Sequence, residues 1–136
     1  MDILLDTHLL LWVLIDDPRL SVQAQDIILN EENTIFYSVA SVWEVAIKHI
    51  KKPDQMFLND EEFVKGCKMA GFRAVPIKEQ HIALLKTLKR RQGKDVPEHH
   101  DPFDRLLICQ SKAESMKFLT HDSLIPYYEE PFIISV

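Results

Sequence analysis

The sequence predicts an α/β domain built on a central, mostly parallel sheet flanked by helices. Two observations lead to this prediction: short apolar or β-branched runs alternate with segments of helical periodicity, and the helical segments are long enough to form crossovers. Strands separated by such helices favour a parallel sheet covered on both faces. The 136 residues can bury one core of this kind, so we expect a single domain over residues 1–136.

The N-terminal third is predicted to contain two strands and two helices. Ile3–Leu5 is a short apolar run typical of a buried strand, and Thr34–Val39 is β-branched and aromatic, as expected of a second strand. Between them, Thr7 is placed to cap a helix that includes Leu9–Val13. Ser21 is placed to cap the next helix.

The middle of the chain is predicted to be largely helical. Ser41 should open a helix that ends at Pro53, because proline interrupts helical hydrogen bonding. Residues 60–70 predict a further helix, and Arg73–Ile77 a short strand. Residues 78–91 carry apolar side chains at helical spacing, which predicts a long amphipathic helix.

The C-terminal third is predicted to hold one loop, one helix and two strands. The mixed polar segment Gly93–His100 reads as a loop, and Pro102–Ala113 as a helix with proline in its first turn. Lys117–Thr120 and Phe132–Ile134 are apolar runs that predict the last two strands.

The composition excludes several classes of protein. Three glycines in the whole chain cannot build a P-loop or a dinucleotide-binding turn. No apolar run approaches the ~20 residues of a membrane span, and the start MDILLD lacks the basic region of a secretory signal. Cys67 and Cys109 form no CxxC pair and are expected to be buried free thiols. We therefore expect a cytoplasmic protein with no membrane partner.

Five carboxylates fall at predicted strand ends or helix starts, where parallel α/β sheets bind ligands. Converging carboxylates repel one another and need a cation, and oxygen ligands favour Mg²⁺ or Mn²⁺ over zinc. Such a site activates water for in-line attack on a phosphate. The pattern therefore predicts metal-dependent hydrolysis at these residues: Asp6, Glu44, Asp101, Asp104 and Asp122.

Charge is unevenly distributed along the chain. Residues 1–45 carry a net charge of −7, residues 46–94 a net charge of +7 and residues 95–136 a net charge of −5, within an overall charge of −5. A basic middle segment beside an acidic centre would hold a polyanionic substrate such as a nucleic acid. The alternative is that these lysines and arginines only solvate helix faces.

Each acidic residue also has a purely structural interpretation. Asp101 can act as the N-cap of the helix that starts at Pro102, and Asp104 is an acid that the helix dipole favours in a first turn. Glu44 can form a capping box with Ser41, since S-x-x-E is that pattern. The two remaining acids could simply form turns, but five such coincidences favour a site.

Four segments together resemble PIN-domain nucleases, and within them the VapC-like toxins of type II toxin–antitoxin pairs. The segments are ILLDTHLLLW, SVASVWEVAIK, HHDPFDRLLICQS and Thr120-His121-Asp122, of which DPFDRLL is the most distinctive. They occur in this order at matching intervals, and the resemblance spans the chain. It implies a PIN-like fold for the whole of residues 1–136.

The resemblance also implies an activity and a set of metal ligands. Asp6 matches the family's first metal-binding aspartate, Glu44 its helix glutamate, Asp104 the acid that opens the DRLLICQS helix, and Asp122 the aspartate after a late strand. Asp101 is an extra carboxylate of the DPFDR pattern. The implied activity is an endoribonuclease using Mg²⁺ or Mn²⁺, with RNA as substrate and 5′-phosphate and 3′-hydroxyl ends as products.

Further expectations follow from the same resemblance. Thr7 and Thr120 would orient neighbouring carboxylates, whereas Arg105 is equally suited to an RNA phosphate or a plain salt bridge. His121 departs from the arginine or other polar residue that related chains often carry. A cognate antitoxin would occlude the acidic site, and the apolar Leu9–Val13 segment favours a homodimer.

Three alternative functions are weighed against this one. The HD pairs at residues 99–101 and 121–122 are typical of all-helical metal phosphohydrolases, but the predicted strands count against that scaffold. A haloacid-dehalogenase-like phosphatase needs an acid two residues after its first aspartate, where this chain has His8. A catalytically idle PIN fold that only binds RNA or protein is the third alternative, and the complete acid set favours an enzyme over it.

The histidines and tryptophans near these motifs receive simpler interpretations. His99 and His100 are expected in an exposed loop, and Trp12 and Trp43 in the core or an interface.

Overall fold

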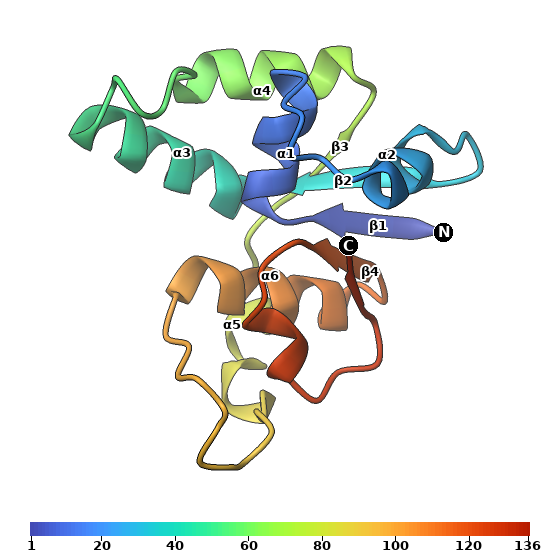
Figure 1. Ribbon diagram of the computed structural model, residues 1–136, viewed down its shortest axis with the longest axis vertical. Helices are drawn as coiled ribbons and strands as arrows, with labels where there is room; N and C mark the ends of the chain where they lie inside the picture. The colour runs from blue at the N-terminus through green and yellow to red at the C-terminus, as the bar shows by residue number, and fades with distance from the viewer.

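The computed structural model describes residues 1–136 as a five-stranded parallel sheet with helices on both faces (Figure 1). The strand order is β3-β2-β1-β4-β5, and every neighbouring pair is parallel. The predicted α/β architecture is therefore confirmed. The strands are β1 (Asp2–Leu5), β2 (Thr34–Ser38), β3 (Arg73–Val75), β4 (Lys117–Thr120) and β5 (Ile133–Ser135).

The helices fall into two groups, one on each face of the sheet (Figure 1). The first group covers one face and consists of α1 (Thr7–Leu14), α2 (Val22–Leu29), α3 (Val39–Lys51) and α4 (Asp60–Met69). The second group covers the other face and consists of α5 (Glu79–Ile82), α6 (Pro102–Ala113) and the short 3₁₀ helices η1 (Leu85–Thr87) and η2 (Ile125–Tyr127). None of these helices is long and apolar enough to cross a membrane.

The strand order reverses beside β1. From β1 the chain moves outward to β2 and β3, and it then returns to place β4 and β5 on the other side of β1. Right-handed crossovers put the connecting helices of the two halves on opposite faces. In open α/β sheets ligands usually bind outside the carboxyl ends of the strands at such a reversal, which here are the ends of β1 and β4.

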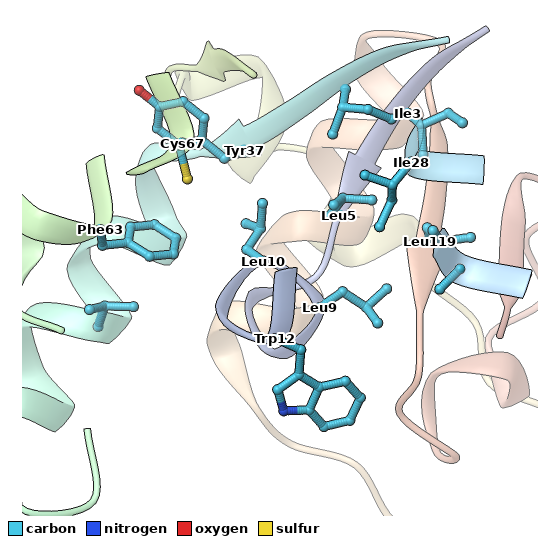
Figure 2. Close-up of a cluster of buried hydrophobic side chains, with 13 residues drawn as sticks. Ile3, Leu5, Leu9, Leu10, Trp12, Ile28, Tyr37, Phe63, Cys67 and Leu119 are labelled. Carbon is cyan, nitrogen blue, oxygen red and sulfur yellow. The ribbon is translucent and has the colours of Figure 1, made fainter. Parts of the chain in front are cut away.

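Each face of the sheet has its own apolar core, because side chains alternate along a strand. Ile3 and Leu5 pack with Leu9, Trp12 and Phe63 beneath the first group of helices, as Figure 2 shows. Leu4, on the same strand, belongs to the opposite core, which contains α6 residues and β4 residues. The predicted free cysteines are confirmed, and both thiols are buried. Burial raises the pKa of the Cys67 thiol to about 12.

The prediction of one long helix over residues 78–91 is wrong. Only α5 and η1 form, separated by a break, and the chain is extended beyond them. The backbone of Lys89 accepts from Glu129 N at 2.8 Å, and Arg91 N donates to Tyr127 O at 2.8 Å. These bonds to a distant segment use the backbone groups that a continuing helix would need, so tertiary pairing overrides the helical pattern.

Two helices start earlier than predicted, because a residue nearer the N-terminus caps each of them. Asp6 rather than Thr7 caps α1, and its carboxylate accepts from Leu9 N at 2.8 Å. Ser38 rather than Ser41 caps α3, accepting from Ala40 N at 3.0 Å. Glu44 therefore lies in the second turn of α3 and forms no capping box with Ser41. The predicted Ser21 cap of α2 is confirmed.

Candidate active site

Asp6 lies directly after β1 with its carboxylate almost completely buried. Its Oδ1 accepts from Leu9 N at the start of α1, and its Oδ2 accepts from Thr120 Oγ1 at 2.5 Å and His121 N at 3.1 Å. These bonds come from α1 and from the end of β4. The side chain is therefore fixed between the two strands where the sheet order reverses.

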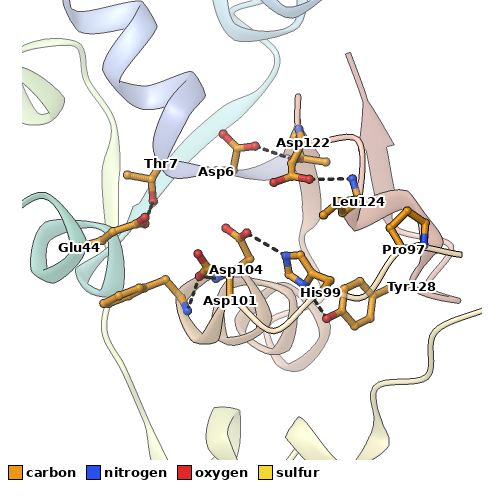
Figure 3. A network of polar contacts seen from close by, with 12 residues as sticks. Asp6, Thr7, Glu44, Pro97, His99, Asp101, Asp104, Asp122, Leu124 and Tyr128 are labelled. Atoms are coloured by element: carbon orange, nitrogen blue, oxygen red, sulfur yellow. Dashed lines mark hydrogen bonds and ion pairs between the residues drawn. The ribbon is translucent and has the colours of Figure 1, made fainter. Parts of the chain in front are cut away.

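Asp122 is held at this carboxyl edge of the sheet by Thr120, which also binds Asp6. The Thr120 hydroxyl accepts from Asp122 N at 3.0 Å, while Asp122 Oδ1 accepts from Leu124 N at 2.7 Å. The second bond forms a turn that starts the segment leading to η2. The carboxyl ends of β1 and β4 thus each carry one aspartate at the same edge of the sheet (Figure 3).

Glu44 reaches the site from α3 as a buried side chain. Its Oε1 accepts from Thr7 Oγ1 at 2.8 Å, and that hydroxyl also lies 2.9 Å from Ser41 Oγ. Its Oε2 pairs with Lys48 Nζ at 2.8 Å, one helical turn away. The predicted contact of Thr7 with a neighbouring carboxylate is observed, so α1 and α3 are joined by a polar bridge beside the site.

Asp104 and Asp101 occupy the N-terminus of α6. Asp101 is exposed and caps the helix, with Oδ1 accepting from Phe103 N at 2.9 Å and Asp104 N at 3.0 Å. Asp104 is half-buried and directed towards the carboxylates that follow β1 and β4 (Figure 3). The capping interpretation of Asp101 is thus observed, and its Oδ2 makes no hydrogen bond within the chain.

His99 is a site residue that sequence reasoning placed incorrectly. It was expected in an exposed loop, but its side chain is only 4% exposed. Its Nε2 lies 3.1 Å from Asp104 Oδ2, and its Nδ1 lies 2.8 Å from the Tyr128 hydroxyl. The contact with Tyr128, a residue near the C-terminus, draws His99 inward, and no local pattern could reveal it. His100, by contrast, is exposed as predicted.

The loop that carries His99 is held by Arg90. The guanidinium of Arg90 donates to the carbonyls of Pro97 and Leu124 and stacks over the Tyr128 ring at 5.2 Å. Pro97 precedes His99 in the loop, and Leu124 follows Asp122. Arg90 therefore joins the two segments that carry these site residues. The sequence suggested only substrate binding or solvation of a helix face for the basic residues of this segment, because contacts with distant carbonyls leave no local pattern.

Electrostatic repulsion and burial act together on the acids. Burial raises the pKa of the Asp6 carboxyl, and the bonds from Thr120 and Leu9 only partly oppose this effect. Burial, followed by the charges of the surrounding acids, raises the pKa of Asp104 to about 8. Those acids are Asp101, Glu44, Asp122 and Asp6. Burial also lowers the pKa of His99.

The donor set fits a divalent cation. One ligand atom each from His99, Asp104 and Asp122 lies within 4.8 Å of the other two, a spacing compatible with ligands around a single ion. Asp6 and Glu44 contribute to the same concentration of negative charge. A cation would offset both the burial and the repulsion from neighbouring acids that together raise the pKa of Asp104.

A groove of about 720 Å³ starts beside the acids and runs between α1 and the C-terminal part of α3. Glu44 and Asp101 line its acidic end, where Lys48 pairs with Glu44. Lys51 and Lys52 line the groove at the C-terminal end of α3. Part of the basic middle segment therefore lies beside the acidic centre, as the charge distribution predicted.

The two tryptophans differ in their environment. Trp12 lies in the core, as predicted, whereas Trp43 is 58% exposed and lies outside it. Trp43 packs edge-on against Phe103 with ring centroids 5.0 Å apart, which places an aromatic pair beside Asp101 and Asp104.

A model of the PIN domain family matches residues 3–130 of this chain. The chain belongs to the PIN domain family. The resemblance seen in the four motifs is therefore confirmed, and the acids of this PIN domain gather at the carboxyl edge of its sheet. No curated protein matches the chain significantly.

Several solved structures share this PIN fold. VapBC2 from Rickettsia felis, bound to a DNA fragment from its promoter, is 16% identical with a TM-score of 0.66, covering 100% of this chain and 98% of that chain. A toxin–antitoxin complex from Klebsiella pneumoniae is 17% identical with a TM-score of 0.57, covering 97% and 95%. FitAB bound to an IR36 DNA fragment is 25% identical with a TM-score of 0.56, covering 90% and 88%.

Proposed function

We propose that this PIN domain is a metal-dependent endoribonuclease, the toxin of a type II toxin–antitoxin pair. The observation that carries the proposal is the meeting of acids from four separate elements at the point where the strand order reverses. Asp6 follows β1, Asp122 follows β4, Glu44 comes from α3 and Asp104 from α6. Membership of the PIN family supports nuclease chemistry at such a site.

The residues proposed to hold Mg²⁺ or Mn²⁺ are Asp6, Asp104 and Asp122, with Glu44 and Asp101 contributing directly or through water. A bound divalent cation supplies water activation and charge neutralisation at a phosphodiester. The chain supplies rigid placement: Thr120 and Leu9 N fix Asp6, and Thr7 fixes Glu44. Asp104 would lose its proton when the cation binds, because the charged form is the ligand.

The groove beside the acids is proposed to receive the RNA backbone. Lys51 and Lys52 are exposed along it, and both lie where phosphates of a strand entering the acidic centre would pass. The exposed Trp43 and the half-buried Phe103 lie at the acidic end and offer apolar faces for unpaired bases.

A cognate antitoxin is the proposed protein partner. The similar Klebsiella pneumoniae structure is a toxin–antitoxin complex, and a partner segment in the groove of this chain would block access to the acids. A homodimer remains a further prediction. The Leu9–Val13 segment supports it less than expected, because Leu9, Leu10 and Trp12 are buried inside the protomer.

The test is cleavage of structured and single-stranded RNA by the purified chain with Mg²⁺, Mn²⁺ or EDTA. Asp6→Asn keeps the shape of the side chain and removes one ligand charge, and Asp26→Asn on the exposed face of α2 is the matched control. Cleavage that is lost in EDTA and in Asp6→Asn, but kept in Asp26→Asn, supports the proposal. RNA binding without cleavage under any metal would favour the idle binding module, and cleavage unchanged by Asp6→Asn would place the activity elsewhere.

A further inference from the structure

The imidazole of His99 lies against two acids of the carboxylate cluster, Asp104 and Asp122. Its Nε2 is 3.1 Å from Asp104 Oδ2, and one of its nitrogens lies within 4.8 Å of ligand oxygens of both Asp104 and Asp122. The side chain is 4% exposed, so water cannot satisfy this nitrogen from outside. The ring edge therefore faces the position that a cation held by the two aspartates would occupy.

The opposite side of the ring is fixed, as it usually is in histidines that bind metals. The Tyr128 hydroxyl lies 2.8 Å from Nδ1, and the two rings pack edge-on at 5.4 Å. A tyrosine hydroxyl can accept a hydrogen bond from Nδ1–H, which leaves the Nε2 lone pair for a metal. Such outer partners set the tautomer and orientation of ligating imidazoles.

Charge balance favours a neutral ligand at this place. Figure 3 shows the carboxylates of Asp6, Glu44, Asp101 and Asp122 gathered around Asp104. A further carboxylate ligand would add to the repulsion among them, whereas a neutral imidazole completes the coordination without adding charge. Its nitrogen also changes the metal preference, because imidazole suits transition metals and Mg²⁺ prefers oxygen.

We propose that His99 is a direct nitrogen ligand of the divalent cation, through Nε2, and that it makes the site prefer Mn²⁺ over Mg²⁺. The inference rests on the proposed function, because it assumes the cation site formed by Asp104 and Asp122. Tyr128 is then a positioning residue that holds the imidazole through Nδ1.

The test is pulsed electron paramagnetic resonance on the full chain, freed of any histidine tag and loaded with Mn²⁺. A directly bound imidazole gives a ¹⁴N coupling to the manganese electron spin, which should change to a ¹⁵N coupling when the protein is made with ¹⁵N-labelled histidine. His99→Gln should remove the coupling, because glutamine offers an oxygen of similar reach. His100→Gln alters the exposed neighbour and should retain it.

Metal affinities measured by titration calorimetry give a second readout. His99→Gln should weaken Mn²⁺ binding by about tenfold or more and change Mg²⁺ binding much less. Tyr128→Phe keeps the ring packing and should weaken Mn²⁺ binding while the nitrogen coupling persists. If His99→Gln does not fold, retention of the coupling when each of the other five histidines is replaced by glutamine assigns it to His99; these are His8, His49, His81, His100 and His121.

Two results would overturn the inference and leave the proposed nuclease intact: Mn²⁺ that binds in an Asp104-dependent way without a nitrogen coupling, or a coupling that survives in folded His99→Gln. A folded chain that binds neither Mn²⁺ nor Mg²⁺ overturns the inference together with the proposed function. The calorimetry therefore separates the failure of the ligand assignment from the failure of the metal site.

Discussion

The Thr120 hydroxyl donates a hydrogen bond to Asp6 Oδ2 at 2.5 Å, joining the ends of β4 and β1. The oxygen of this Thr120 hydroxyl also accepts a hydrogen bond from Asp122 N at 3.0 Å. One buried hydroxyl thus sets the position of two acids that are 116 residues apart in the chain. The relationship exists because β1 and β4 are neighbours in register, with Leu5 opposite Leu119.

Thr120→Val should therefore lower activity while leaving the fold intact. Valine keeps the branched shape of the strand residue but removes the bond to Asp6, so we expect a loss of roughly 10–100-fold in metal affinity or cleavage rate. Titration with Mn²⁺ and an RNA cleavage assay measure the two quantities. Thr120→Ser keeps the hydroxyl and should retain most of both, and equal losses in the serine variant would contradict this role.

The pH dependence of stability should follow Asp104. Its folded-state pKa of about 8 lies above its ordinary value of 3.8, so the folded chain holds a proton that the unfolded chain releases between these values. The free energy of unfolding of the metal-free protein should consequently fall as pH rises from about 4 to about 8. Thermal unfolding in EDTA across this range measures the effect.

Two comparisons isolate that contribution. Asp104→Asn removes the titration and should flatten the Tm profile, with a gain at pH 8 of about 1 kcal/mol or more, equivalent to roughly 4 °C. Asp95→Asn in the exposed loop should leave the profile unchanged.

Added Mg²⁺ or Mn²⁺ should stabilise the wild type more at pH 8 than at pH 6, because the cation binds the ionised carboxylate of Asp104. A stabilisation by metal that does not depend on pH would count against Asp104 as a ligand.

Arg90→Lys should loosen the segment that carries His99. Lysine cannot reach the carbonyls of Pro97 and Leu124 together or stack as guanidinium does over Tyr128. We expect a loss of roughly 2 kcal/mol in stability and faster amide exchange in residues 93–100. Arg91→Lys is the control, because Arg91 is exposed and stacks only on Tyr127; equal effects of the two variants would argue against the anchoring role.

The lysines of the groove should contribute to RNA binding through phosphate contacts. The logarithm of the affinity for single-stranded RNA falls as the logarithm of the salt concentration rises. Lys51→Gln and Lys52→Gln should each make this negative slope shallower by about 0.7, because each removes one phosphate contact. The measurement uses Asp6→Asn protein in EDTA, which prevents cleavage during the titration. Lys65→Gln and Lys68→Gln on exposed positions of α4 are matched controls, and a similar decrease in them would mean that the groove is not the path of the RNA.

Much of the fold was predictable because its signals are local. Ile3–Leu5 is a short apolar run, and Phe118 and Leu119 form the apolar centre of the segment 117–120. Adjacent strand residues point to opposite faces, so short apolar stretches of this kind favour strands buried on both faces. Ser21 and the Asp101–Pro102 pair act within one helical turn, so they mark helix starts directly. The acids at strand ends were visible for the same reason, since their positions depend on where each element stops.

Only the tertiary structure decided the contacts between distant segments. The helix expected over residues 78–91 gave way to backbone pairing with Tyr127–Glu129, and His99 is buried because Tyr128 and Asp104 approach it from other parts of the chain. Periodicity and capping describe a residue's neighbours along the chain, whereas these bonds form only after the sheet has been assembled. The sequence by itself therefore determined most of the helices and strands and the candidate acids. The packing of distant segments decided where residues 78–91 leave the helix and placed His99 beside those acids, because such contacts form between residues that are not neighbours along the chain.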